Sequence, residues 1–269
     1  MTVELLPLAW TGSLGAVVGA VLALTGAGGG AIAVPLLVFG AGLSMQAAAP
    51  VALVAVGLAA VLGAVIGLRA GRVRYRAAAL IGVAGMLLAP GGVALAARMP
   101  QQPLLLMFAA FMAWTAWRMW RPAVAAPGAV PVCRRPKGEH RLRWTRACAW
   151  ALAGTGAVAG LLSGLLGVGG GFVIVPALLR RTNLDLHSIQ ATSLAVIALV
   201  TAGGIVAAAW QGQLQAGSAG PFALGAAAGL LLGRQFAGRL APDALRRGFA
   251  VVTGLVATLM VWRVVGTGM

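Results

Sequence analysis

The sequence predicts an all-α polytopic integral membrane protein that is built from two inverted repeats. Three observations support this fold class: an apolar composition, a set of apolar segments of membrane-spanning length, and a glycine-rich motif that occurs twice. Of the 269 residues, 61% are hydrophobic and 9% are charged, whereas soluble domains average about 45–50% and 25%. So few charges could not cover the surface of a soluble chain. The composition therefore excludes a cytosolic enzyme, a disulfide scaffold and a disordered chain.

Eight apolar segments are long enough to cross a bilayer as helices, which takes about 20 residues. They lie near 5–24, 47–68, 77–97, 103–121, 147–166, 188–210, 218–238 and 244–266. Two shorter apolar segments, 31–42 and 172–179, each follow a run of glycines and are short for a full crossing. No Lys or Arg precedes the first segment, so we interpret it as a retained helix rather than a cleaved signal peptide.

The chain divides into two similar halves around a polar linker. Residues 1–121 form the first predicted membrane repeat, 122–146 a basic cytoplasmic linker, and 147–269 the second repeat. The motif LTGAGGGAIAVPLL of the first half returns as LLGVGGGFVIVPAL in the second half, 141 residues later. Gln46 and Gln190 lie near the start of the next apolar segment in each half. Repetition over this much of the chain indicates an internal duplication.

The net charge of +16 predicts an orientation in the membrane. The basic residues lie in short loops between apolar segments and not on one amphipathic face, so we do not expect a nucleic-acid partner. Under the positive-inside rule, the linker and the loops at Arg69–Arg76, Arg180–Arg181 and Arg239–Arg247 face the cytoplasm. Loops 40–46, 98–102 and 211–217 and both termini then lie outside.

This orientation turns residues 147–179 into a hairpin that enters from the cytoplasm, reverses at the glycines and returns. By the repeat, residues 5–42 form the same hairpin entering from the outside. Each half then consists of a glycine-broken helical hairpin plus three transmembrane helices, and the two halves are inverted. Inverted repeats with broken helices are typical of secondary transporters.

The glycine runs, each followed by Pro35 or Pro176, are the core of the predicted binding site. A helix broken at membrane depth must face protein or a wet cavity. The half-helix after the break presents free N–H groups and a positive dipole end, which suit an anion. Close helix packing is the alternative interpretation of the same glycines. We expect the two runs to meet near the midplane around a polar cavity that contains Gln46 and Gln190.

The remaining candidates are polar side chains near the second motif. Thr192 and Ser193 have Ala48 and Ala49 opposite them in the first half, so hydroxyl donors would come from the second half alone. Arg234 either reaches the membrane interface or faces the cavity. The full predicted substrate-binding set is Gly28, Gly29, Gly30, Gln46, Gly169, Gly170, Gly171, Gln190, Thr192, Ser193 and Arg234.

Acidic residues are almost absent, and this limits the chemistry. The chain has only 4 Asp and Glu, all at the ends of segments or in loops. We therefore expect no sodium or proton site built on a carboxylate, no metal, no cofactor and no enzymatic activity. Ser163 and His187 lack the third group that would orient a nucleophile and base. Cys133 and Cys148 form no CxxC pair, and we interpret both as incidental.

The twin GxGGGxxxVP motifs, followed by Gln-Ala in the first half and Gln-Ala-Thr-Ser in the second, resemble those of the TauE/SafE family of sulfite exporters and anion permeases. The resemblance covers nearly the whole chain apart from the linker, and the first copy departs from it at Ala48 and Ala49. It implies a multi-pass protein of the inner (plasma) membrane that exports a small sulfur-containing anion, such as sulfite, sulfoacetate or another organosulfonate. Its expected partners are that anion, the lipid bilayer and a second copy of the chain in a homodimer. The competing interpretation is a non-transporting membrane scaffold packed through its glycine ladders.

Overall fold

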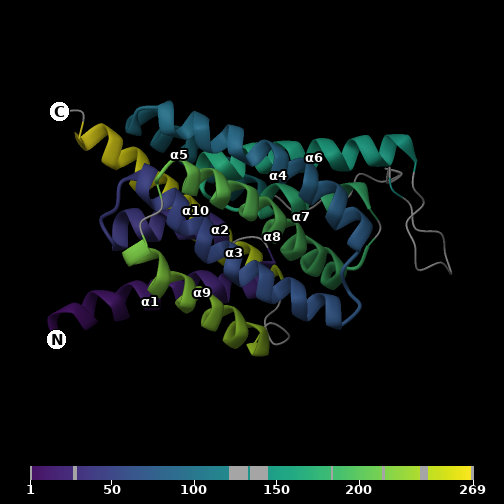
Figure 1. Ribbon diagram of the computed structural model, residues 1–269, viewed down its shortest axis with the longest axis horizontal. Helices are drawn as coiled ribbons and strands as arrows, with labels where there is room; N and C mark the ends of the chain where they lie inside the picture. The colour runs from purple at the N-terminus through teal and green to yellow at the C-terminus, as the bar shows by residue number, and fades with distance from the viewer. Residues whose placement is uncertain are drawn as a thin grey trace.

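The structure is a computed structural model that describes residues 2–26, 29–120, 133, 145–182, 184–213, 216–236 and 242–267. These residues form a bundle of helices, which Figure 1 shows along its shortest axis. The elements are α1 (Thr2–Thr25), α2 (Gly29–Pro35), the π-helical turn η1 (Leu36–Gly40), α3 (Met45–Arg69), α4 (Tyr75–Arg98), α5 (Gln101–Trp120), α6 (Arg146–Leu166), α7 (Gly171–Arg181), α8 (Leu186–Trp210), α9 (Ala216–Phe236) and α10 (Pro242–Thr267).

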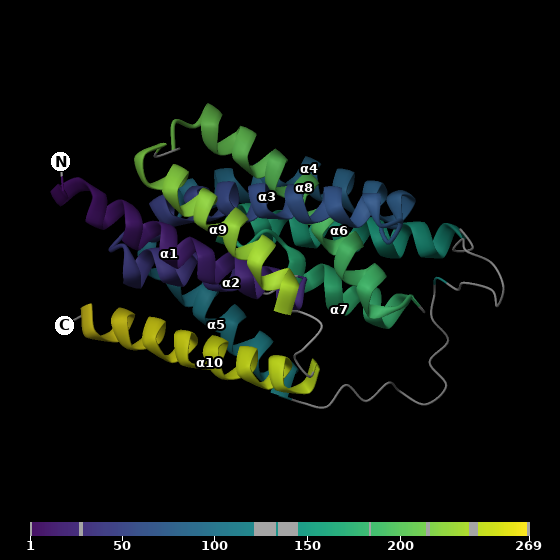
Figure 2. The same cartoon turned by 90° about the horizontal axis from the view of Figure 1, so that it is seen from below.

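The all-α prediction is confirmed across the described residues, and the predicted segments coincide with the helices. Five helices are long and apolar enough to cross a membrane: α1 from Leu8, α3, α4, α6 and α8. The segments predicted at 103–121, 218–238 and 244–266 are the helices α5, α9 and α10, whose crossing stays a prediction. Both chain ends lie at one end of the bundle, whereas α6 begins at the opposite end (Figures 1 and 2).

Glycines let α4 and α6 touch backbone to backbone. A Cβ on Gly156 would overlap the carbonyl oxygen of Ile81, and one on Gly160 would overlap that of Gly85. Small residues at such spacing allow helices in lipid to approach closely, where no hydrophobic force drives them together.

A second set of such backbone contacts through glycines, which we call a glycine ladder, joins α1 and α9. A Cβ on Gly15 would overlap the carbonyl oxygen of Phe222, and one on Gly19 would overlap that of Ala226. These residues are the repeat equivalents of the α6 and α4 residues above, each 141 positions away. The sequence duplication is therefore also a duplication of packing.

Helices α3 and α8 form the centre of the bundle and run antiparallel. Gly57 lies against Thr201 near the middle of the pair. Toward the end of α3, a Cβ on Gly67 would lie 3.0 Å from the Cβ of Ala191, which is near the start of α8. The remaining pair, α5 and α10, packs together at the side of the bundle.

The interpretation of the two cysteines as incidental is wrong. Cys133 and Cys148 form a disulfide with a Cα–Cα distance of 5.2 Å, so residue 133 is attached to the first turn of α6. Sequence spacing alone could not reveal this pairing, because the helix start and the linker approach each other only in the folded chain.

Because of the ladder between α4 and α6, a methyl group added at Gly160 should lower the free energy of unfolding, whereas one added at Gly154 should not. Gly160→Ala should lower the free energy of unfolding by about 1–3 kcal/mol, as overpacking does. The matched control is Gly154→Ala on the same helix, where a Cβ would meet nothing within 4 Å. Thermal unfolding of the purified protein in detergent measures both, and equal midpoints for the two variants would contradict the ladder.

Candidate functional site

The first candidate element is a hairpin formed by α1, α2 and η1. The chain leaves α1 at Gly26, whose φ of +70° is comfortable only for glycine. It then returns along α1 and brings Gly40 beside Trp10. The indole Nε1 of Trp10 donates a 3.0 Å hydrogen bond to the carbonyl oxygen of Gly40. On the way back, Gly29 packs against Val18 and Leu22 of α1. Gly28 lies outside the described residues.

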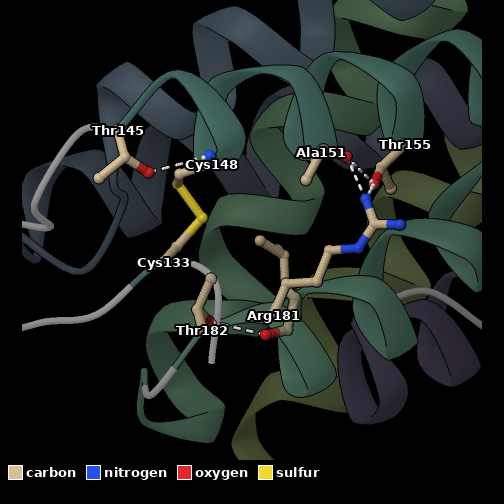
Figure 3. Close-up of a disulfide and its surroundings, with 8 residues drawn as sticks. Cys133, Thr145, Cys148, Ala151, Thr155, Arg181 and Thr182 are labelled. Carbon is tan, nitrogen blue, oxygen red and sulfur yellow. Dashed lines mark hydrogen bonds between the residues drawn. A yellow bond between two sulfur atoms is a disulfide. The ribbon is translucent and has the colours of Figure 1, made fainter. Parts of the chain in front are cut away.

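The second hairpin, formed by α6 and α7, repeats this arrangement. The break contains Gly167, Gly169 and Gly170, all with positive φ, and α7 begins at Gly171. The guanidinium of Arg181 donates hydrogen bonds to the carbonyl oxygen of Ala151 and to Thr155 Oγ1 (Figure 3). Ala151 and Arg181 are the repeat equivalents of Trp10 and Gly40, so both hairpins close at the same place.

The two breaks meet inside the bundle. A Cβ on Gly30 would overlap the carbonyl oxygen of Val168, which lies within the second glycine run. Each hairpin also reaches across to a central helix of the other half. Gly26 lies against the side chain of Gln190 in α8, and Gly167 lies against Ala49 in α3.

The structure does not bring Gln46 and Gln190 together. Gln190 donates a 3.4 Å hydrogen bond from Nε2 to the carbonyl oxygen of Leu24, next to the first break. Gln46 donates from Nε2 to the carbonyl oxygen of Met99, also over 3.4 Å, at the other end of the bundle. Each glutamine lies near the start of its helix, and α3 and α8 are antiparallel, so they are separated by roughly 30 Å of helix.

The space beside Gln46 is small. A cavity of about 10 Å³ lies between α3, α4 and α6, where its lining includes Gln46, Ala49 and Gly164. This volume holds about one water molecule, and the lining is mostly apolar. The expected polar cavity shared by both glutamines is therefore not seen in this conformation among the described residues.

Thr192 has a structural partner. Its Oγ1 accepts a 3.0 Å hydrogen bond from the backbone N–H of Arg74, which holds the α3–α4 turn against the start of α8. Asp185 caps that helix by accepting a 3.0 Å hydrogen bond from the N–H of Ser188. Partial burial raises the pKa of Asp185, but the Ser188 hydrogen bonds and the charge of Arg74 outweigh it, so the pKa lies below its ordinary value.

Arg234 lies at the same end of the bundle. It is half-buried on the last turn of α9, close enough to Arg72 for the two charges to interact. The neighbouring Gly233 packs against Ala20 and Ala23, about one turn before the first break. Arg234 thus lies beside the first hairpin, and its role toward a substrate stays a prediction.

Two buried hydroxyl groups near the second break, those of Ser163 and Ser193, have no hydrogen-bond partner among the residues that the structure describes. Both side chains are 0% exposed. Other buried hydroxyls, such as those of Thr201 and Thr253, donate to the carbonyl oxygen four residues earlier in their own helix. Hydroxyl groups in helices commonly satisfy themselves in this way. An unsatisfied buried hydroxyl therefore calls for a bound partner such as water or a ligand.

Ser163 lies one turn before the second glycine break, and Ser193 lies one turn from a residue that contacts it. The carbonyl oxygen of Ser163 accepts a 2.8 Å hydrogen bond from the N–H of Gly167. Ser193 lies one turn before Ile197, whose side chain contacts Gly169. The binding set predicted from the sequence includes Ser193 but not Ser163.

A polytopic helical protein with two broken hairpins that meet inside the bundle has the architecture of a membrane transporter. The family model described as Sulfite exporter TauE/SafE matches residues 12–260. Two proteins of Xylella fastidiosa, from strains Temecula1 and 9a5c, are each described as a probable membrane transporter protein. Each is 31% identical over 254 residues, which covers 93% of this chain and of the relative. The chain belongs to the TauE/SafE family of membrane transporters. No solved structure gives a significant match.

We expect the unpartnered serines to contribute to substrate affinity but not to the stability of the fold. Ser163→Ala and Ser193→Ala should each raise the substrate concentration for half-maximal flux by about tenfold, since a hydrogen bond to a charged group contributes roughly 1.5 kcal/mol. Neither variant should lower the unfolding midpoint, because no hydrogen bond within the protein is lost. Thr253→Val, which removes a satisfied hydroxyl on α10, is the control and should leave affinity unchanged. Wild-type affinity in both serine variants would exclude these hydroxyls from the site.

Proposed function

We propose that this protein exports a small sulfur-containing oxyanion, such as sulfite or an organosulfonate, across the inner (plasma) membrane. The family description supports the substrate class, and the transporter names of the Xylella relatives support the activity. The observation that carries the proposal is the meeting of the two glycine breaks at Gly30 and Val168. A scaffold has no need for two broken hairpins that cross inside the bundle.

The anion would be held by neutral donors at the second break. The hydroxyls of Ser163 and Ser193 are buried and unpartnered, and α7 begins there with its positive dipole end. An oxyanion offers several acceptor oxygens to such donors. Uncharged donors bind an anion more weakly than a fixed guanidinium, which favours release on the other side.

The proposed architecture is a pair of inverted repeats. A two-fold axis perpendicular to the antiparallel helices α3 and α8 would exchange them and would pass near Gly57 and Thr201. These two residues are repeat equivalents in the same register as Gln46 and Gln190. If these helices cross the bilayer, that axis lies in the membrane plane. The recurrence of the α4–α6 ladder in α1–α9 supports the same axis.

The membrane potential is the proposed driving force. None of the five membrane-length helices contains Asp or Glu within its apolar span, so they offer no carboxylate for a coupling cation. With the cytoplasm negative, moving one negative charge outward releases about 2.3 kcal/mol per 100 mV. This energy supports a concentration ratio of roughly 50-fold at that potential.

A scaffold that binds partners through its glycine ladders is disfavoured by the packing. The ladder glycines at 15, 19, 156 and 160 contact backbone of the same chain, so these faces are already occupied. A homodimer would have to use another surface.

The inverted architecture predicts opposite sides for two equivalent loops. In a background with both native cysteines replaced by Ser, Gln211→Cys should react with a membrane-impermeant maleimide added to intact cells. Arg72→Cys should react only after the membrane is opened. Both positions are exposed, so access depends on the side. Labelling of both from outside would contradict the inversion, and labelling of Arg72→Cys alone would reverse the orientation.

If the membrane potential drives export, the protein should move sulfite without a proton or sodium gradient. Proteoliposomes loaded with sulfite, with no pH or sodium gradient, should release it when a potassium-diffusion potential makes the interior negative. Reversing the potential should reverse the net movement. If the direction ignores the potential and only a proton or sodium gradient drives flux, the uniport mechanism is wrong. Absence of flux for sulfite and organosulfonates under every gradient would contradict the proposed function.

A further inference from the structure

Cys133 connects the linker to both arms of the second hairpin. Its sulfur is bonded to that of Cys148 in the first turn of α6. Its backbone N–H donates a 2.9 Å hydrogen bond to the carbonyl oxygen of Arg181 at the end of α7. An isolated β-bridge also pairs Cys133 with Thr182, and Figure 3 shows the two residues next to each other. This one residue therefore lies across the base of the hairpin that carries the second glycine break.

The first hairpin has no disulfide at its base, because the chain has only 2 cysteines. Its equivalent closure includes the hydrogen bond from Trp10 to Gly40. In the second hairpin, Arg181 bonds to Ala151 and Thr155 across the two arms, and oxidised Cys133 adds a connection that is covalent to α6 and hydrogen-bonded to α7. An oxidised second hairpin is thus held more firmly at its base than the first.

The charge pattern assigns this disulfide to the reducing side of the membrane. Arg146 lies at the start of α6, and Arg180 and Arg181 lie at the end of α7, on either side of the disulfide. The linker itself is also basic. Such clusters face the cytoplasm under the positive-inside rule. Cytosolic disulfides are usually transient and catalytic or redox-sensing rather than structural.

We propose that Cys133 and Cys148 form a reversible dithiol–disulfide site whose oxidised form clamps the second hairpin and slows transport. The co-reactant is a small-molecule disulfide. One cysteine thiolate attacks it, releasing one small thiol and forming a mixed disulfide. The second cysteine thiolate then displaces the other small thiol, so two protein thiols are oxidised while one small disulfide is reduced. The effect on transport rests on the proposed function, whereas the redox chemistry does not.

The surroundings of the two sulfurs suit formation and then persistence of the bond. Cys148 lies in the first turn of α6, where the helix dipole favours the attacking thiolate. The Cα–Cα distance of 5.2 Å lies within the disulfide range. Once closed, Cys133 is 0% and Cys148 1% exposed, so both sulfurs are shielded from a reductant in solution. The clamped state should therefore outlast the oxidant.

The redox site can be tested without transport, because the chain contains no other cysteine. Membranes from unstressed cells, treated with maleimide-PEG after denaturation, should show two adducts per chain. Pretreatment with glutathione disulfide should remove both adducts and raise the unfolding midpoint, and dithiothreitol should restore two. In Cys133→Ser, the control, exchange should stop at the mixed disulfide, so glutathione disulfide should remove its single adduct without raising its unfolding midpoint, and dithiothreitol should restore the adduct. No adducts in unstressed cells, or two under both treatments, would overturn the reversible site.

The consequence for transport is measured in proteoliposomes loaded with sulfite. Oxidation should lower the initial flux about tenfold, the size of a typical coupling between two sites, and dithiothreitol should restore it. Cys133→Ser and Cys148→Ser should transport equally in both conditions. Unchanged wild-type flux with complete loss of adducts would overturn the clamp. If the reduced protein moves no anion at all, the proposed function fails, while the adduct count and the unfolding midpoint still decide the redox site.

Discussion

Backbone contact through glycine is the constraint on which the rest of this structure depends. Lipid provides no hydrophobic force between helices, so close approach at small residues must supply the packing. Gly15 and Gly19 allow α1 to touch α9, and their repeat equivalents do the same between α6 and α4. The same property allows Gly30 to meet Val168, where the two hairpins cross. A Cβ at any of these points would separate backbones that the fold needs in contact.

These contacts connect the scaffold to the site. The ladders fix α1 and α6, the outer arms of the two hairpins, against the long helices α9 and α4. The returning arms, α2 with η1 and α7, are short, and side-chain bonds such as that between Trp10 and Gly40 hold them at their bases. In the second hairpin the disulfide joins Cys133 to α6, and Cys133 in turn donates a hydrogen bond to the end of α7.

The sequence was sufficient to predict the helices, their limits and the two hairpins, because apolar length and repeated glycines are local signals. It also predicted the meeting of the glycine runs. It did not predict the separation of Gln46 and Gln190, which follows because each lies near the start of its helix and α3 and α8 run antiparallel. The disulfide was missed because spacing along the chain does not report distance in space. Ser163 was missed because the packing of the folded chain decides whether a buried hydroxyl finds a partner, and the sequence does not report that packing.

The central claim is that the anion passes where the two glycine breaks meet. It is tested most directly by the sulfite flux of Gly30→Ala in proteoliposomes, expressed per folded protein after size-exclusion chromatography. Gly19→Ala on α1 is the matched control, because its Cβ would overlap backbone in a ladder and not at the break. The account predicts that folded Gly30→Ala loses transport while folded Gly19→Ala retains it. Wild-type flux through folded Gly30→Ala, or equal loss in both variants, would contradict the claim.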